Sequence, residues 1–204
     1  CLRLSVSINE TVHAAILSET EITYISKHEG KDRVSIINNI GASLPAHASA
    51  IGKSLLSKYS DDELLELYDN KLLQQFTPNT INSLDRLVDE VSKVRENGYS
   101  TEVGEVSLLA ACISIPIRQN NNIIAAISIT VPVTKLNEEY KMFLLNKLNE
   151  SREEIEFLIN MGNVSWLLNY KIILFSNKCY RKKSIYVLWY DYRINKKCFG
   201  GLIN

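Results

Sequence analysis

Short runs of β-branched and aromatic residues, separated by polar turns, dominate the first part of the chain. The runs cover residues 11–17, 22–26 and 34–37, and the turns between them cover 18–21 and 28–32. Such runs are typical of strands, and short connections favour antiparallel neighbours. We therefore predict an antiparallel meander of about three strands.

In the middle of the chain, the spacing of side chains is typical of helices. Residues 46–56 are rich in small side chains, which predicts a helix that begins close to the sheet. Ser60 and Glu63 have the spacing of a capping box that opens a short second helix. Apolar residues then recur every three or four positions from 84 to 94, which predicts an amphipathic helix that ends at Gly98.

A second set of strands and a long helix complete the pattern. Strands are predicted over residues 99–103, 110–117 and 123–131, and the last two are almost entirely apolar or small. That composition favours central strands covered on both faces. Residues 138–159 form a long helix with one apolar side. Strands, helices, strands and a helix together predict an α+β fold, a sheet with helices packed on its faces.

The composition adds to this prediction because the average charge of the chain combines two segments of opposite charge balance. With 46% hydrophobic residues, the 204-residue chain can bury one core, which excludes a disordered polypeptide. Its 23 basic and 23 acidic residues argue against a nucleic-acid surface spread over the whole chain. Residues 1–163 nevertheless hold 15 basic and 22 acidic residues, whereas residues 164–204 hold eight basic residues and a single acid, Asp191.

Cysteine and histidine spacing indicates neither a metal site nor a disulfide framework. The four cysteines lie far apart without a CxxC pair, and the three histidines lie in the first quarter of the chain. We therefore expect no metal and no cofactor. No basic segment followed by an apolar one comes after Cys1, and the apolar run 164–175 is too short to cross a bilayer. We expect a cytoplasmic protein without a membrane partner.

Six segments resemble, in order and spacing, the effector-binding domain of IclR-type bacterial transcriptional regulators. They are residues 44–56, Thr77 with Thr80, 94–99, Glu102 with Glu105, 112–116 and 125–130. The similarity covers about residues 5–161. It implies a GAF-like α+β domain with a mostly antiparallel sheet, which senses a small metabolite and is not an enzyme.

The resemblance also implies a domain organisation. Residues 1–10 would be the end of a linker from an N-terminal winged helix-turn-helix, and 11–161 the effector-binding domain. Residues 162–204 would be an atypical basic, aromatic tail outside the fold. DNA would be bound only through the N-terminal domain, which is absent from this chain. Regulators of this kind, repressors among them, act as homodimers or homotetramers.

A pocket can be placed on physical grounds. If residues 46–52 open a helix, their free backbone N–H groups suit a ligand carboxylate. Ser128 and Thr130 stand two apart on a strand, so their hydroxyls share a face. Cys112 on the neighbouring strand is small enough to line the same cavity.

The family resemblance gives the candidate site residues. Positions matching six residues of this chain contact small acids in the family, and a seventh, Ile36, falls near an apolar wall. The six are Ala50, Ile51, Glu102, Cys112, Ser128 and Thr130.

Two departures from the family bear on the ligand. Leu109 stands where the family usually has Gly, and Glu102 where Asp is common, so we expect a narrower or reshaped cavity. No Lys or Arg lies among the predicted positions, and an ionised Glu102 accepts hydrogen bonds but cannot donate them. The predicted ligand is a small hydroxy or keto carboxylic acid, with acids derived from sugars as examples of the class.

Simpler interpretations stay open for single residues. Cys112 can be a small buried residue of a central strand, and Ser128 and Thr130 can hydrogen-bond across strands. His47 is expected to be solvated or to cap a helix rather than to act as a base for Cys112. Lys53 is expected to be solvated, and Glu105 to be solvated or paired with a neighbouring Lys or Arg.

Two other functions compete with effector sensing. One is a GAF-like enzyme that uses Cys112 as a redox or nucleophilic thiol, which requires an accessible thiol of lowered pKa. The other is an oligomerisation module with a vestigial pocket.

Residues 164–204 match nothing in the family and hold nine of the 17 aromatic residues. Three interpretations are open: a segment outside the fold, such as an out-of-frame translation, an extra hairpin over 184–192, or a basic aromatic strip for nucleic acid. We favour the first.

Overall fold

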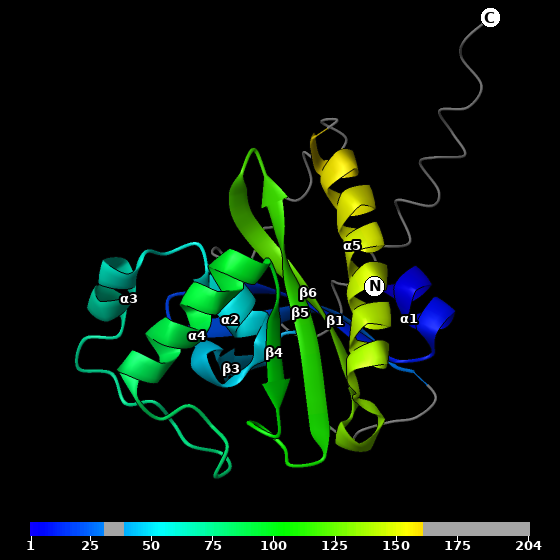
Figure 1. The fold of residues 1–204 in the computed structure, drawn as a ribbon. Coiled ribbons are helices and arrows are strands. Elements are labelled where there is room, and N and C mark those ends of the chain that lie inside the picture. Colours follow the sequence, from blue (N-terminus) through cyan, green and yellow to red (C-terminus); the bar gives the residue numbers. More distant parts are fainter. Residues whose placement is uncertain (31–38, 161–204) are drawn as a thin grey trace, which may run out of the picture. The chain divides into compact units, whose positions relative to one another are not determined.

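Six strands form one antiparallel sheet in the described part of the computed structural model, residues 1–30 and 39–160 (Figure 1). Their order across the sheet is β3-β2-β1-β6-β5-β4. The strands are β1 (Thr11–Ser18), β2 (Glu21–His28), β3 (Ser43–Pro45), β4 (Ser100–Val103), β5 (Ala110–Gln119) and β6 (Asn122–Pro132). The expected strand over 34–37, with Ile36, and the expected tail over 162–204 lie outside the described residues.

Helices cover both faces of this sheet. They are α1 (Leu2–Ile8), α2 (Ala50–Leu56), α3 (Asp61–Leu67), α4 (Leu84–Asn97) and α5 (Glu138–Asn160), with short 3-10 turns η1 (Ala46–Ala48) and η2 (Val133–Lys135). On one face α2 packs against β1, β4, β5 and β6, and α4 packs behind it. On the other face α5 packs against β5 and β6, and α1 lies beside α5 (Figure 1). The α+β prediction is confirmed.

Most predicted elements form for the reasons that predicted them. Ser60 accepts a hydrogen bond from the Glu63 N–H while the Glu63 carboxylate accepts one from the Ser60 N–H, so both halves of the capping box are present. Gly98 ends α4 at φ 78°, in the left-handed region where glycine is favoured. The strands β4, β5 and β6 begin and end within two residues of the predicted limits.

Residues 2–8 form the helix α1, and the assignment of residues 1–10 to the end of a linker stays a prediction. One local feature differs from expectation. The helix expected over 46–56 is interrupted at Ser49, which has extended backbone and accepts a hydrogen bond from the Gly52 N–H at 3.1 Å. A Cβ at Gly52 would lie 2.1 Å from the Ala46 carbonyl oxygen, so η1 can cross α2 this closely only because position 52 is glycine.

The strand register gives the two faces of the central sheet different chemistry. Directly paired residues share a face, and on the α2 face two polar rows run across neighbouring strands. The rows are Glu102–Cys112–Thr130–Thr11 and Ser100–Ser114–Ser128–His13. The alternate positions, which face α5, are apolar and almost fully buried. They include Val12, Ala111, Ile113, Ile115, Ile127, Ile129 and Val131.

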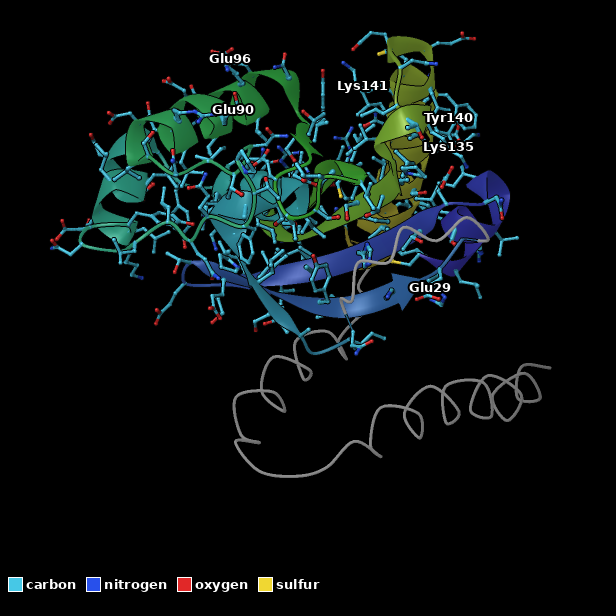
Figure 2. The ribbon with its side chains drawn as sticks, turned by 90° about the horizontal axis from the view of Figure 1, so that it is seen from below. Glu29, Glu90, Glu96, Lys135, Tyr140 and Lys141 are labelled. Atoms are coloured by element: carbon cyan, nitrogen blue, oxygen red, sulfur yellow. The ribbon has the colours of Figure 1, made fainter. Side chains whose placement is uncertain are left out.

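The α5 face is anchored by a buried acid. The Glu10 carboxylate, 2% exposed, accepts a hydrogen bond from the Tyr140 hydroxyl at 2.8 Å and contacts Lys135 Nζ at 3.3 Å. Figure 2 shows Tyr140 on α5 with Lys135 next to it, away from Glu90 and Glu96 on α4. Among the described residues, no helix is long and apolar enough to span a bilayer.

Candidate functional site

A cavity lies between the start of α2 and the polar face of the sheet. The atom-free space in and in front of this recess is about 330 Å³, open solvent included. Eleven residues line it: His13, Tyr24, Leu44, Ser49, Ala50, Ile51, Glu102, Val106, Cys112, Ser128 and Thr130.

Six of the seven candidate site residues lie around this one cavity. Ala50 and Ile51 come from the first turn of α2, and Glu102, Cys112, Ser128 and Thr130 from the polar rows of β4, β5 and β6. The seventh, Ile36, lies outside the described residues. The structure therefore brings together residues 80 positions apart in sequence, and their contact with a ligand stays a prediction.

A hydrogen-bonded chain crosses the sheet at the base of the cavity. The Cys112 Sγ lies 3.3 Å from Thr130 Oγ1, which in turn lies 3.5 Å from His13 Nδ1. His13 is 3% exposed, and its ring packs against Tyr24 with centroids 5.2 Å apart. Burial, together with the charge of Lys27, lowers the pKa of His13 to about 4, so its imidazole is neutral near pH 7.

Sequence reasoning missed His13. Its only local signal is strand alternation, which places Thr11 and His13 on one face and Val12 on the other. That β1 lies beside β6, and so aligns His13 with Ser128, follows from a long-range strand order that the sequence pattern does not contain.

Glu102 connects the cavity to the loop between β4 and β5. Its Oε1 accepts hydrogen bonds from the Glu105 N–H at 2.5 Å and the Val106 N–H at 3.2 Å. Burial raises the pKa of Glu102, and hydrogen bonds from Cys112 and from these two N–H groups oppose the rise. The cavity therefore contains a fixed acceptor next to a loop that the same carboxylate holds in place.

A buried ion pair supports that loop from α2. Lys53 is 1% exposed, and its Nζ lies 2.6 Å from Oε1 of Glu105, which is 8% exposed. Burial raises the pKa of Glu105, and the charge of Lys53 opposes the rise. The expectation of a solvated Lys53 is wrong: the small residues around it let α2 lie so close to the sheet that its side chain has no path to solvent. Of the two expectations for Glu105, pairing with a Lys or Arg is confirmed and solvation is wrong.

Threonine hydroxyls hold the same loop from the other side. The Thr80 hydroxyl donates to the Glu105 carbonyl oxygen at 2.6 Å, and the Thr77 hydroxyl donates to the Gly104 carbonyl oxygen at 2.6 Å. The loop backbone beside the cavity is therefore held by three separate segments of the chain.

Cys112 does not have the environment of a reactive thiol. Burial, reinforced by the negative charge of Glu102, raises its pKa well above the ordinary value. His47, the candidate base for an enzymatic Cys112, is not among the residues lining the cavity. It is buried, with Nε2 2.9 Å from the Gln74 carbonyl oxygen, so the expectation of a solvated or helix-capping histidine is wrong.

Leu109 does not narrow the cavity, contrary to expectation. Its side chain is 74% exposed, and its backbone carbonyl accepts a hydrogen bond from the Val133 N–H at 3.0 Å. Val106 instead supplies the loop's apolar contact to the cavity. No cluster of three or more His, Cys, Asp or Glu side chains suited to a metal ion occurs in residues 1–30 and 39–160.

Comparison with protein families identifies a matching model. Residues 2–157 match the model described as "Bacterial transcriptional regulator IclR C-terminal". Curated relatives include the HTH-type transcriptional repressors AllR of Salmonella typhi and of Escherichia coli K12, each 35% identical over 138 residues. These alignments cover 67% of this chain and 51% of the relatives, so the chain spans about half of their length.

Solved structures show the same fold. The C-terminal domain of the E. coli regulator KdgR is 29% identical with a TM-score of 0.68, covering 76% of this chain and 90% of that one. The Thermotoga maritima IclR is 30% identical with a TM-score of 0.72, covering 76% and 63%. An IclR homologue from Microbacterium hydrocarbonoxydans, complexed with 4-hydroxybenzoate, is 25% identical with a TM-score of 0.69, covering 76% and 63%.

Proposed function

This chain belongs to the family of C-terminal domains of bacterial IclR transcriptional regulators, and from that premise we propose that it senses a small hydroxy or keto carboxylic acid in the cavity between α2 and the sheet. The observation that carries the proposal is the convergence of hydroxyl, imidazole, thiol and carboxylate groups on one small cavity. A few convergent polar groups in a largely apolar recess are typical of small-molecule sites.

The polar groups suit both ends of such a ligand. Ser128 provides a hydroxyl that can donate to a carboxylate, Thr130 provides a second hydroxyl oxygen beside it, and no Lys or Arg lines the cavity among the described residues. Glu102 provides an acceptor, which favours a ligand hydroxyl over a second carboxylate because two carboxylates repel. The Microbacterium homologue's ligand, 4-hydroxybenzoate, carries one carboxylate and one hydroxyl, which supports this class.

The regulatory role of the complete protein extends the proposal. The AllR relatives are transcriptional repressors, and this chain matches about half of each. We infer that the domain is part of a repressor that binds DNA through a separate N-terminal winged helix-turn-helix and assembles as a homodimer or homotetramer. Residues 11–161 would be its effector-binding domain.

An enzymatic function of Cys112 is disfavoured by its environment. A working thiol needs a lowered pKa, and burial raises that of Cys112. Iodoacetamide at pH 7.5 should therefore alkylate Cys112 at least tenfold more slowly in the folded domain than in urea, as followed by mass spectrometry. Labelling of the folded protein as fast as that of the unfolded protein would favour the enzyme.

Titration calorimetry with four compounds of similar size tests the function. Lactate and pyruvate carry a carboxylate with a hydroxyl or keto group, propionate lacks the second group, and propane-1,2-diol lacks the carboxylate. We expect lactate or pyruvate to bind and to raise the melting temperature with concentration, with weaker binding of propionate and none of the diol. Preference for the uncharged diol would refute the proposal, and a response to none of the four would favour a vestigial pocket.

A further inference from the structure

His13 is a buried polar residue whose hydrogen bonding is incomplete. Its Nε2 is buried and has no hydrogen-bond partner among the described residues, while Nδ1 faces Thr130 Oγ1 at 3.5 Å. A buried ring nitrogen without a partner lowers the stability of the fold, and native structures rarely contain such a group without a functional reason. The ring lies in the cavity wall between Tyr24 and Thr130, which also line the cavity.

The neighbours of His13 determine which ring nitrogen carries the proton. The Cys112 thiol is protonated and hydrogen-bonds to the Glu102 carboxylate, which accepts and cannot donate. The Cys112 sulfur is then only a weak acceptor for the Thr130 hydroxyl, whereas an imidazole nitrogen is a strong one. From this difference in acceptor strength we infer that the Thr130 O–H donates to His13 Nδ1, which places the proton of the neutral ring on Nε2.

We propose that His13 is an effector-contact residue, whose Nε2–H donates a hydrogen bond to a carboxylate or keto oxygen of the bound acid. This inference rests on the proposed function and adds to it a residue that determines specificity. The cavity then offers two hydrogen-bond donors, His13 and Ser128, and one acceptor, Glu102, on the same polar rows of the sheet. A hydroxy acid can pair with the donors and with the acceptor, a keto acid pairs with the donors alone, and a simple amine pairs with neither donor.

The neutral state of the His13 ring determines how this residue recognises a ligand. An imidazolium would also attract a carboxylate, but burial holds the pKa of His13 at about 4, and the charge of Lys27 adds to this effect. Glu29 opposes it. Near pH 7 His13 therefore recognises an oxygen by its position and direction, through one hydrogen bond, rather than by charge.

Two variants separate this role from a packing role. The side-chain amide of Gln reaches about as far as Nε2, whereas that of Asn reaches only as far as Nδ1. His13→Gln should retain most of the affinity for pyruvate or lactate, and His13→Asn should weaken it roughly tenfold to hundredfold, the loss of one hydrogen bond to a charged group. Equal affinity of His13→Asn and the unchanged protein in calorimetry would overturn the proposal while leaving the proposed function standing.

The tautomer can be measured without any variant. Two-bond ¹H–¹⁵N correlation spectra of the ligand-free protein should show His13 as the Nε2–H tautomer, and Thr130→Val should remove this preference. Saturation with pyruvate should shift the Nε2 resonance. An Nδ1–H tautomer in the free protein, or an unchanged Nε2 resonance at saturation, would overturn the proposal. Failure of lactate and pyruvate to bind the unchanged protein would instead contradict the proposed function.

Discussion

The two faces of the central strands differ in what they contribute, although they are made by alternate residues of the same segments. Facing α5, Ile113, Ile127 and Ile129 are almost fully buried and form an apolar layer. Facing α2, Cys112 and Thr130 belong to polar rows that border a cavity. Burial of apolar area stabilises a fold, whereas burial of polar groups lowers stability unless each is hydrogen-bonded.

The difference indicates that one face of the sheet mainly stabilises the fold and the other mainly forms the candidate binding site. The central strands present mainly apolar side chains towards α5, and beside them the buried Glu10 carboxylate pairs through Oε1 with Tyr140 and Lys135. The α2 face keeps groups that are incompletely paired, including His13 Nε2 and Glu105 Oε2 among the described residues. Such groups lower stability in the free protein, and a ligand that pairs with them recovers the loss.

Breaking the buried ion pair should have the largest effect on stability. Lys53→Met leaves Glu105 charged and buried without its partner, so we expect a loss of about 3–5 kcal/mol in urea unfolding. The exposed pair of Lys147 with Glu150, 2.7 Å apart, provides the matched control. Lys147→Met should cost less than about 1 kcal/mol. Similar losses for the two variants would contradict the burial of Lys53.

Substitutions at neighbouring positions of β6 should distinguish the roles of the two faces in stability and in ligand binding. Ile129→Ala removes buried apolar volume beneath α5 and should cost about 2–5 kcal/mol of unfolding free energy, with little change in affinity at a temperature where the variant is folded. Ser128→Ala should cost about 1 kcal/mol or less and weaken pyruvate binding several-fold. If both variants lose stability and affinity alike, the faces are not functionally distinct.

Lowering the pH should lower the unfolding free energy of the protein because His13, on the polar face, is protonated more readily in the unfolded state. The unfolded residue takes up a proton below pH 6.5 and the folded one only below about 4, so the unfolded state binds more protons between these values. The stability that neutral His13 contributes is present above pH 6.5 and is lost as pH falls towards 4, by on the order of 3 kcal/mol. In the His13→Gln variant, the unfolding free energy measured with urea should depend less on pH between about pH 4 and 6.5. An equal pH dependence in the variant and the unchanged protein would contradict the lowered pKa of His13.

Removing residues 164–204 should have the smallest effect. If this segment lies outside the effector domain, a chain ending at residue 163 should keep its melting temperature within a few degrees and its affinity for pyruvate within about twofold. A truncated chain that fails to fold would show that the segment belongs to the domain.

Local patterns in the sequence predicted much of this fold. The α4 helix follows from its apolar spacing and Gly98, and α3 from the Ser60 capping box, because these signals act within a few residues. The break at Ser49 was not predictable in the same way. It depends on the close crossing of η1 and α2 at Gly52, a contact that only the folded chain reveals.

The candidate site was predictable to a lesser degree. The family resemblance pointed to six residues that the structure gathers around one cavity. It did not point to His13, whose position depends on the pairing of β1 with β6, or to the burial of Lys53, which depends on how closely α2 lies on the sheet. Long-range packing, rather than local pattern, decides both.

Methyl-labelled NMR spectra recorded during a titration with pyruvate test the central claim most directly, because they report both faces in one sample. We expect the largest shifts at the methyl groups of Thr130 and Ile51, which line the cavity, and the smallest at Ile159, which is buried on α5. Saturable shifts confined to the cavity would support binding at the polar face. Shifts centred on α5, with Thr130 and Ile51 unchanged, would contradict it.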